Sequence, residues 1–239
     1  MYQAILFDLD DTLFSLRGCE AQALRRTLDD ARLMTAMPAS YIESYATISS
    51  GYWAARSTNR RTKYTREEVV ELSWRDFMSA HDLDESRSAA LAQRYWKEFC
   101  RSSALNPGAE AVLQRLSKTY RLGMVTNGYS DSQRGRLEAA GLQEVFNPLL
   151  ISEEVGVAKP DIRIFELALS KLELDPDEVL YVGDSISHDR EGCLRAGIDF
   201  CHYCPEPPPC NLPPVKYGIR RLHDLIAILP SDLTPWSSI

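Results

Sequence analysis

A short apolar run near the start of the chain ends abruptly in carboxylates. Residues 4–7 read Ala-Ile-Leu-Phe, and Asp8, Asp10 and Asp11 follow directly. An uninterrupted apolar run of this length is typical of a strand that is buried on both faces of a parallel sheet. The acidic residues then lie at the carboxyl end of that strand, which is where open α/β sheets bind their ligands.

Helical periodicity dominates the next segment, residues 16–101, which shows almost no strand pattern. We expect four helices, which begin near Arg17, at Ala39, after the capping box Thr65-Arg66-Glu67-Glu68, and shortly before Leu91. The apolar faces of the first, third and fourth are Ala21, Leu24, Leu28 and Ala31; Val70, Trp74, Phe77 and Met78; and Leu91, Tyr95 and Phe99. This insertion predicts a helical cap domain over residues 16–101, with residues 1–15 and 102–239 forming the core.

From Asn106 onward the pattern alternates between helix and strand. Strands are expected at 121–126, 149–152, 179–182 and 198–202, and helices at 107–118, at 130–140, from Pro160, at 187–196 and at 222–229. Ser130 and Gln133 are spaced as a second capping box, and Pro160 is placed to open a helix. A proline-rich loop follows at 205–214. The alternation predicts an α/β fold with a doubly wound parallel sheet.

Composition narrows the class of protein. The chain of 239 residues is 44% hydrophobic and 26% charged, as in ordinary globular proteins, and its net charge of −7 argues against a nucleic-acid polymer as the main partner. No apolar stretch approaches the roughly 20 residues of a membrane span, and Asp8 interrupts the first apolar run too early for a signal peptide. The six cysteines are scattered, so we expect reduced thiols and a cytoplasmic location.

Polar residues follow the ends of several predicted strands. In chain order these are Asp8 and Asp10; Thr126, Asn127 and Gly128; Lys159, just before the Pro160 helix; and Asp184 with Asp189. Each group alone has an ordinary explanation, since Asn-Gly is a common turn, Lys-Pro is common in solvated loops, and an Asp can cap a helix. Parallel strands end at one edge of their sheet, so we expect these side chains to converge there.

Together these groups resemble the four ordered motifs of the haloacid dehalogenase superfamily of hydrolases, over about residues 4–201. The resemblance implies a Rossmann-like core, and the helical insertion lies where that superfamily's common cap type is found. It also implies an enzyme that acts on a small phosphorylated metabolite. The run Phe-Asp-Leu-Asp-Asp-Thr-Leu-Phe is similar to nucleotidase members, which makes a nucleoside monophosphate the substrate hypothesis.

Hydrolysis of a phosphate ester needs a nucleophile, a proton donor for the leaving oxygen, and positive charge at the phosphoryl oxygens. We expect Asp8 to be the nucleophile and to form an aspartyl phosphate. Asp10 points the same way in extended chain, and we expect it to protonate the leaving oxygen and then to activate water. These roles require an ionised Asp8 and an intermittently protonated Asp10, so their environments should push the two pKa values apart.

An all-oxygen set of ligands suits Mg²⁺. The expected metal ligands are the Asp8 carboxylate, the Asp10 backbone carbonyl and Asp184. Asp189 is expected to orient metal-bound water or Lys159 rather than to bind the metal. The expected phosphate contacts are the Thr126 hydroxyl, the Asn127 amide, the Lys159 charge, and Gly128, which permits a close backbone approach.

Other residues are weaker candidates for a functional site. Cys201, His202, Cys204 and Cys210 suggest zinc, but they lack the second well-spaced pair of a structural site, which favours ordinary thiols. His188 is expected to be a surface residue at a helix start. In the cap, Tyr52 and Trp53 with Arg56, Arg60, Arg61 and Lys63 could receive a base and a phosphate. We favour packing of the two aromatics in the cap core, with the cations facing water.

Three other functions stay open. A 2-haloacid dehalogenase would also use Asp8 as nucleophile, but halide leaves without a proton donor or metal, and the resemblance implies that such members lack the acid that Asp10 supplies here. A sugar-phosphate mutase would retain the phosphate on a bis-phosphate product. A non-catalytic binding protein gains nothing from carboxylates beside phosphate, so the complete acidic set disfavours that function.

Overall fold

The computed structural model describes residues 1–33, 38–58, 64–206 and 214–229. Arg60, Arg61, Lys63, Cys210 and most of the proline-rich loop lie outside these ranges. The chain divides into two compact units, one formed by Met1–Leu16 with Ser103–Ile239 and the other by Arg17–Ser102. No helix in the described ranges combines the length and apolarity that crossing a membrane requires.

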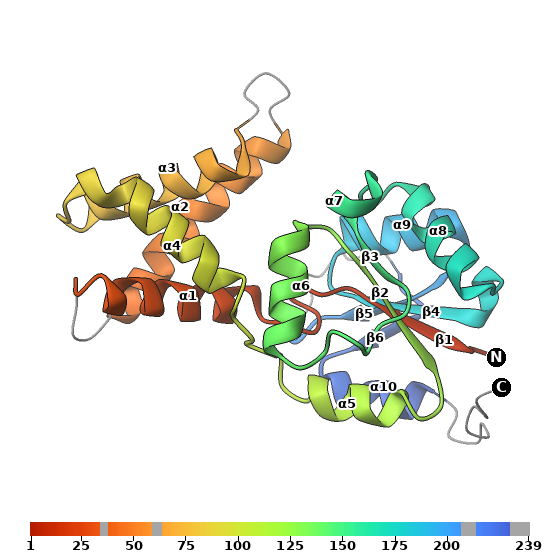
Figure 1. The fold of residues 1–239 in the computed structure, drawn as a ribbon. Coiled ribbons are helices and arrows are strands. Elements are labelled where there is room, and N and C mark those ends of the chain that lie inside the picture. Colours follow the sequence, from red (N-terminus) through yellow and green to blue (C-terminus); the bar gives the residue numbers. More distant parts are fainter. Residues whose placement is uncertain (34–37, 59–63, 207–213, 230–239) are drawn as a thin grey trace. The chain divides into compact units, whose positions relative to one another are not determined.

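The first unit is built on a six-stranded sheet with the order β3-β2-β1-β4-β5-β6 (Figure 1). The strands are β1 (Ala4–Phe7), β2 (Arg121–Thr126), β3 (Leu149–Ile151), β4 (Val179–Gly183), β5 (Asp199–Tyr203) and β6 (Tyr217–Ile219). Every pairing is parallel, and Phe7 of β1 lies opposite Met124 of β2 and Val182 of β4. The structure thus confirms the predicted α/β fold with a doubly wound parallel sheet.

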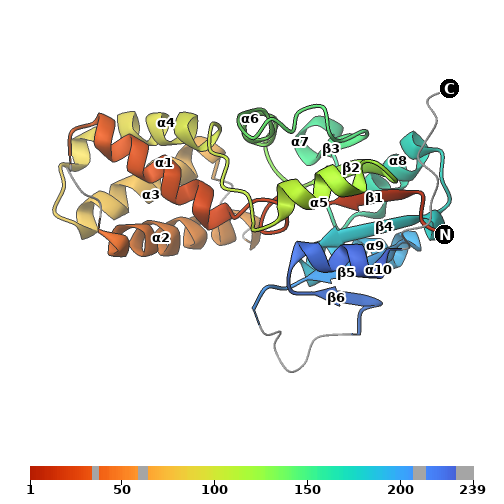
Figure 2. The same ribbon diagram turned by 90° about the horizontal axis from the view of Figure 1, so that it is seen from below.

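Helices cover both faces of this sheet. Helices α8 (Ile162–Leu172) and α9 (Glu191–Ala196) lie on one face, and α5 (Ala109–Leu116) and α10 (Leu225–Ile228) lie on the other (Figures 1 and 2). Side chains alternate along β1, so Ala4 and Leu6 join the core against α8, while Phe7 contacts Phe146 on the opposite side. Burial on both faces explains why β1 is apolar at every position.

Several element boundaries differ from the sequence prediction. Helix α8 begins at Ile162 rather than at Pro160, because Asp161 is its N-cap and accepts a hydrogen bond from the Arg163 backbone N–H at 3.0 Å. The helix expected at 187–196 starts as a π-helical turn, Ile186–Arg190, that continues into α9. The C-terminal helix is a 3-10 turn, Leu222–Asp224, followed by α10, and strand β6 was missed.

Helix α6 (Ser130–Ala139) does not have the predicted capping box. Tyr129 is its N-cap and makes no side-chain capping bond. The Gln133 side chain, which the box would have used, is bonded to Asp10 instead. A short helix, α7 (Ser152–Val155), follows β3 and faces α6 through the ion pair of Arg134 with Glu154.

The second unit contains helices α1 (Leu16–Asp30), α2 (Ala39–Thr58), α3 (Arg66–Ala80) and α4 (Ser88–Phe99), with a 3-10 turn at Glu85–Arg87. The predicted capping box of α3 is formed in both directions between Thr65 and Glu68. The aromatic rings at the centre of this unit are Tyr45, Trp74, Phe77 and Tyr95. The expected apolar faces of α3 and α4 are buried.

Two expectations for this unit were wrong in part, although Leu24 and Leu28 are buried and Arg56 is exposed as predicted. The buried face of α1 is Cys19, Ala23, Leu24, Thr27 and Leu28, so Ala21 is only half-buried and Ala31 lies beyond the helix. Tyr52 and Trp53 are half-exposed rather than packed in the core. The Tyr52 hydroxyl donates to Asp76 at 2.5 Å, and the Arg56 guanidinium lies 6.0 Å from the centre of the Trp53 ring.

Candidate active site

The predicted polar residues meet at the carboxyl edge of the three central strands. Strands β2, β1 and β4 are neighbours in the sheet, and they end beside Thr126, Asp8 and Asp184 respectively. The strand order reverses between β1 and β4, which is where open α/β sheets have their ligand crevice. Sheet topology therefore brings together residues that are far apart in the sequence.

Lys159 is buried among acceptors at this edge and is only 4% exposed. Its Nζ donates to Asp8 Oδ1 at 2.5 Å, to Asp189 Oδ1 at 2.7 Å and to the Tyr181 hydroxyl at 2.9 Å. The Tyr181 hydroxyl lies 2.9 Å from the Val125 carbonyl oxygen, so it can donate there while it accepts from Lys159. All three ammonium protons thus have partners, which is what a buried lysine requires.

Asp189 is fully buried, and its position depends on two local features. The π-helical turn is capped by Ser185, whose Oγ accepts from the His188 backbone N–H at 3.2 Å. Asp189 Oδ2 accepts from the Ser185 backbone N–H at 3.0 Å, and a Cβ at Gly183 would clash with that oxygen. The turn directs Asp189 inward and leaves His188 exposed, as predicted for His188.

Asp184 completes a cluster of three carboxylates. Among the residues that the structure describes, oxygens of Asp8, Asp184 and Asp189 lie within 4.8 Å of one another. The Thr12 hydroxyl donates to Asp184 Oδ1 at 3.5 Å, and the ring of His202 contacts the Asp184 backbone carbonyl. The cluster holds three carboxyl groups and the ammonium of Lys159, so its fully ionised form has a surplus of negative charge equal to the charge of a divalent cation. This all-oxygen donor set fits Mg²⁺.

The pKa values of the cluster reflect burial first and the neighbouring carboxylates second. Burial raises the pKa of Asp184 to about 7, and the charges of Asp189 and Asp11 add to the effect. Burial also raises the pKa of Asp8 well above its usual range, although the Lys159 charge opposes the shift. Burial alone would lower the pKa of Lys159, but Asp8 and Asp189 outweigh it and raise that pKa. A bound cation would reverse the shifts of the carboxylates, because it favours their charged form.

Asp10 has a different set of partners, which the sequence did not reveal. Arg136 of α6 contacts both of its oxygens, with Nη1 2.5 Å from Oδ1 and Nη2 3.0 Å from Oδ2. Burial raises the pKa of Asp10, but the Arg136 charge and the hydrogen bonds from Arg136 and Gln133 outweigh it, so the pKa is lowered. The pKa values of Asp8 and Asp10 therefore diverge as expected, but in the direction opposite to the one expected.

The Thr126-Asn127-Gly128 segment at the end of β2 contacts Gln133 and the backbone of Lys159. Thr126 is fully buried, and its Oγ1 lies 3.3 Å from Gln133 Nε2. The Asn127 side chain accepts from the Lys159 backbone N–H at 2.9 Å and donates to the Lys159 carbonyl at 3.0 Å. At Gly128 the group that approaches closely is the Gln133 side chain, with which a Cβ would clash. This segment thus fixes the backbone of Lys159 and makes room for Gln133.

Sequence reasoning missed Tyr181, Gln133 and Arg136. Tyr181 lies within an apolar strand, where an aromatic residue reads as core. Arg136 is one of two arginines in α6, and composition does not distinguish it from Arg134, whose side chain is 55% exposed. The signal available was the spacing of Gln133, Arg136 and Leu137, which places all three on one helical face.

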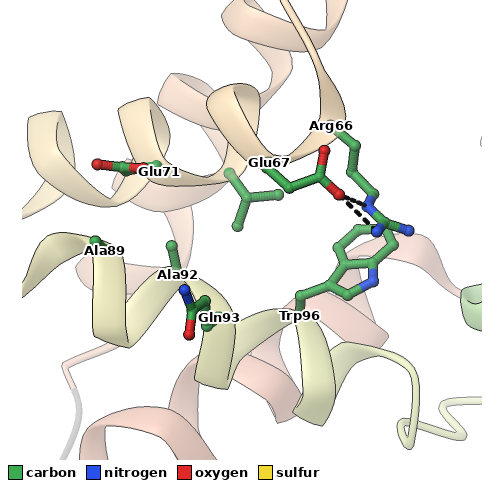
Figure 3. A pocket seen from close by; sticks show the side chains of 8 residues that line it. Arg66, Glu67, Glu71, Ala89, Ala92, Gln93 and Trp96 are labelled. Atoms are coloured by element: carbon green, nitrogen blue, oxygen red, sulfur yellow. Dashed lines mark hydrogen bonds and ion pairs between the residues drawn. The ribbon is translucent and has the colours of Figure 1, made fainter.

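Two further features lie apart from the cluster. A pocket of about 220 Å³ lies in the helical unit between α3 and α4 (Figure 3). There Arg66 pairs with Glu67 at 2.6 Å and lies over the Trp96 ring at 4.8 Å, so its charge is already engaged. Near β5, the Cys204 thiol donates to the Glu206 carbonyl, while His202 is turned toward Asp184.

Comparison with known proteins gives consistent matches. A family model described as haloacid dehalogenase-like hydrolase matches residues 2–197. The HAD-hydrolase YfnB of Bacillus subtilis is 32% identical over 98% of this chain and 97% of its own. Its magnesium-bound crystal structure, described as revealing interdomain movement, aligns at 31% identity with a TM-score of 0.79 over 95% of this chain and 98% of that one.

Two other known proteins are similar to this chain. The pyrimidine 5′-nucleotidase YjjG of Escherichia coli is 31% identical over 94% of this chain and 96% of its own. The L-2-haloacid dehalogenase of Xanthobacter autotrophicus is 19% identical, with a TM-score of 0.67 over 95% of this chain and 98% of that one. At that identity the second match shows a shared fold.

Proposed function

The chain belongs to the haloacid dehalogenase-like hydrolase family, and we propose that it is a Mg²⁺-dependent hydrolase of small phosphate monoesters that works through an aspartyl phosphate. The observation that carries this proposal is the buried contact of Lys159 with Asp8 and Asp189, beside Asp184. A carboxylate nucleophile beside a fixed cation and a surplus of acidic oxygens suits attack on a phosphoryl group.

In the first half-reaction, a carboxylate oxygen of Asp8 attacks phosphorus and the bond to the leaving oxygen breaks. Asp10 in its protonated form donates a proton to that oxygen, so an alcohol departs and Asp10 is left as the carboxylate that Arg136 stabilises. Lys159 stabilises the charge of the phosphoryl oxygens, and Thr126 with the backbone N–H of Asn127 are the proposed further donors. Asn127 contributes in addition through Lys159, whose backbone it holds.

In the second half-reaction, water attacks the aspartyl phosphate, and Asp10 accepts its proton. The ion pair with Arg136 favours the carboxylate form of Asp10, which is the form that this step needs. The proposed ligands of Mg²⁺ are the Asp8 carboxylate, the Asp10 backbone carbonyl and Asp184. When bound, the ion would supply the charge that lets anionic phosphate approach three carboxylates.

Asp189 is proposed as the residue that orients Lys159. Its Oδ1 accepts from Lys159, and its Oδ2 is held by the Ser185 backbone N–H. The helical unit Arg17–Ser102 is proposed as the cap domain that selects the substrate. A nucleoside monophosphate is the proposed substrate class, supported by the identity of 31% with a pyrimidine 5′-nucleotidase over nearly the whole chain.

The alternative function is that of a dehalogenase, since one of the similar solved structures is an L-2-haloacid dehalogenase. Expulsion of halide requires neither a proton donor nor a metal site, so it would leave Asp10 and the surplus charge at Asp184 without a purpose. The complete set of acids therefore favours phosphate ester hydrolysis.

The test is a screen of phosphate monoesters, with p-nitrophenyl phosphate first, in Mg²⁺ and in excess chelator. We expect turnover that requires the metal and that Asp8→Asn abolishes, while circular dichroism shows an intact fold. Asp82→Asn is the matched control, because Asp82 is exposed and its left-handed backbone suits Asn. Undiminished turnover in Asp8→Asn, or in chelator, would refute the proposal.

A further inference from the structure

Arg136 is among the largest fully buried side chains of the protein, and it is 1% exposed. Burying a guanidinium is unfavourable unless charge and hydrogen bonds compensate, so its position is specific. Its two terminal nitrogens contact the two oxygens of Asp10, which is the forked geometry that arginine forms with carboxylates. Arg136 thus constrains the plane of the Asp10 carboxylate.

Gln133 reinforces that contact from one turn earlier in α6. Its Nε2 donates to Asp10 Oδ2 at 3.1 Å, and its Oε1 accepts from Arg136 Nη2 at 2.5 Å. The same Nε2 lies 3.1 Å from the Asn127 carbonyl oxygen. Gln133 therefore ties the Asp10 carboxylate both to Arg136 and to the end of β2. The missing side chain of Gly128 leaves the space that Gln133 occupies.

We propose that Gln133 and Arg136 are positioning residues that hold the Asp10 carboxylate in the orientation from which it exchanges a proton with the leaving oxygen and with water. This inference rests on the proposed phosphatase function. Both residues act through Asp10. Arg136 is fixed to the helix backbone through Nε and the Ser132 carbonyl, so the helix transmits its rigidity to the carboxylate.

A purely structural pair, which merely anchored α6 to β1, would affect every substrate equally. A positioning pair would affect most the substrates that need a proton from Asp10. Nitrophenolate leaves without a proton, whereas an alkoxide requires one. The ratio of kcat/KM for an alkyl phosphate to kcat/KM for p-nitrophenyl phosphate therefore separates the two roles, because kcat/KM reports the step in which the leaving group departs.

The experiment measures that ratio for wild type, Gln133→Met and Arg136→Lys, with Asp10→Asn as reference. General acid catalysis contributes about 10²–10⁴-fold, so we expect the ratio to fall by about 10- to 100-fold in both positioning variants and further in Asp10→Asn. Arg134→Met is the matched control, since Arg134 is an exposed arginine of the same helix that contacts Glu154. Thermal melts test whether each variant is folded. If Gln133→Met is unstable, Arg136→Lys still tests the inference, because it keeps the positive charge beside Asp10.

A double variant, Asp10→Asn with Gln133→Met, tests whether Gln133 acts through Asp10. In that background we expect Gln133→Met to change the ratio by less than about twofold, because coupled residues are not additive. Two results would overturn the inference. One is a ratio that stays unchanged in Gln133→Met and Arg136→Lys, and the other is a full additional fall of the ratio in the double variant. A wild-type protein inactive on both substrates would instead refute the proposed phosphatase.

Discussion

Lys159 Nζ lies 2.5 Å from Asp8 Oδ1, although 151 positions separate the two residues in the chain. The same nitrogen lies 2.7 Å from Asp189 Oδ1, so one cation holds a carboxylate that follows β1 and a carboxylate from the π-helical turn after β4. The contact forms only when β1 and β4 are paired and the segment before α8 crosses their ends. Assembly of the sheet and assembly of the site are thus one event.

Lys159→Met should destabilise the protein as well as inactivate it. Removal of the ammonium leaves Asp8 and Asp189 as buried acids without their shared cation, which typically costs about 3–5 kcal/mol. Urea unfolding in the absence of Mg²⁺ measures the change in the free energy of unfolding. Adding Asp189→Asn to Lys159→Met should recover part of the stability but none of the activity. A Lys159→Met protein as stable as wild type would contradict the electrostatic role described for Lys159.

The metal-free protein should lose stability as pH rises through the range in which Asp184 ionises. Its pKa is raised from 3.8 to about 7 in the folded state, so between these values the folded state binds more protons than the unfolded state. The free energy of unfolding therefore falls as pH increases across that window. Thermal melts of wild type and Asp184→Asn isolate this contribution. The Tm of wild type minus the Tm of the variant should be smaller at about pH 7 than at about pH 4.

Added Mg²⁺ should cancel this loss, because it binds the deprotonated carboxylates. The Mg²⁺-induced rise in Tm should grow as pH increases over the same interval and should be absent in Asp184→Asn. If the rise in Tm is independent of pH, the carboxylate cluster is not the metal site.

Gly128→Ala should disturb the site through Gln133. The added methyl would clash with the Gln133 side chain, which must then move away from Asp10. Overpacking of this kind costs about 1–3 kcal/mol, and hydrolysis of alkyl phosphates should fall with it. Gly51→Ala is the control, because no atom lies near a Cβ there and Ala is favoured in the helix interior by up to about 1 kcal/mol. Full activity of Gly128→Ala on alkyl phosphates would show that hydrolysis does not depend on the position of the Gln133 side chain.

The nucleotide hypothesis predicts that a base improves the substrate. Uridine 5′-monophosphate and ribose 5-phosphate share their phosphate and sugar carbon skeleton, so kcat/KM on the pair reports recognition of the base. We expect a higher kcat/KM for the nucleotide, carried mainly by KM if the base only adds binding energy. Equal values for the two compounds would remove nucleotides as the substrate class.

The positions of the candidate site residues were predictable where a local pattern coincides with a strand end. The apolar run before Asp8 and the Gly183-Asp184 step identify strand ends without any knowledge of the partners, and parallel topology then brings them together. The capping box at Thr65 was predictable for a similar reason, since all of its hydrogen bonds are local. Patterns of this kind need only a few adjacent residues.

Prediction failed where a distant partner outweighed a local preference. Ser130 and Gln133 satisfy the spacing of a capping box, but the Asp10 carboxylate offers Gln133 a buried, charged acceptor. Tyr181 reads as an apolar strand residue because its hydroxyl partners, Lys159 and Val125, come from other parts of the chain. Strand β6 was missed because it is only three residues long, with Gly218 at its centre.

The central position of β1 also has a consequence for synthesis of the chain. This strand is translated before either neighbour, and its partners begin only at Arg121 and Val179. The helices of Arg17–Ser102 contact one another locally and can form before β1 has paired with β2 and β4. Local contacts form quickly, whereas pairings of distant strands form slowly. We expect a nascent chain to expose an apolar strand until residue 183 has left the ribosome, which makes β1 the segment most in need of protection by chaperones.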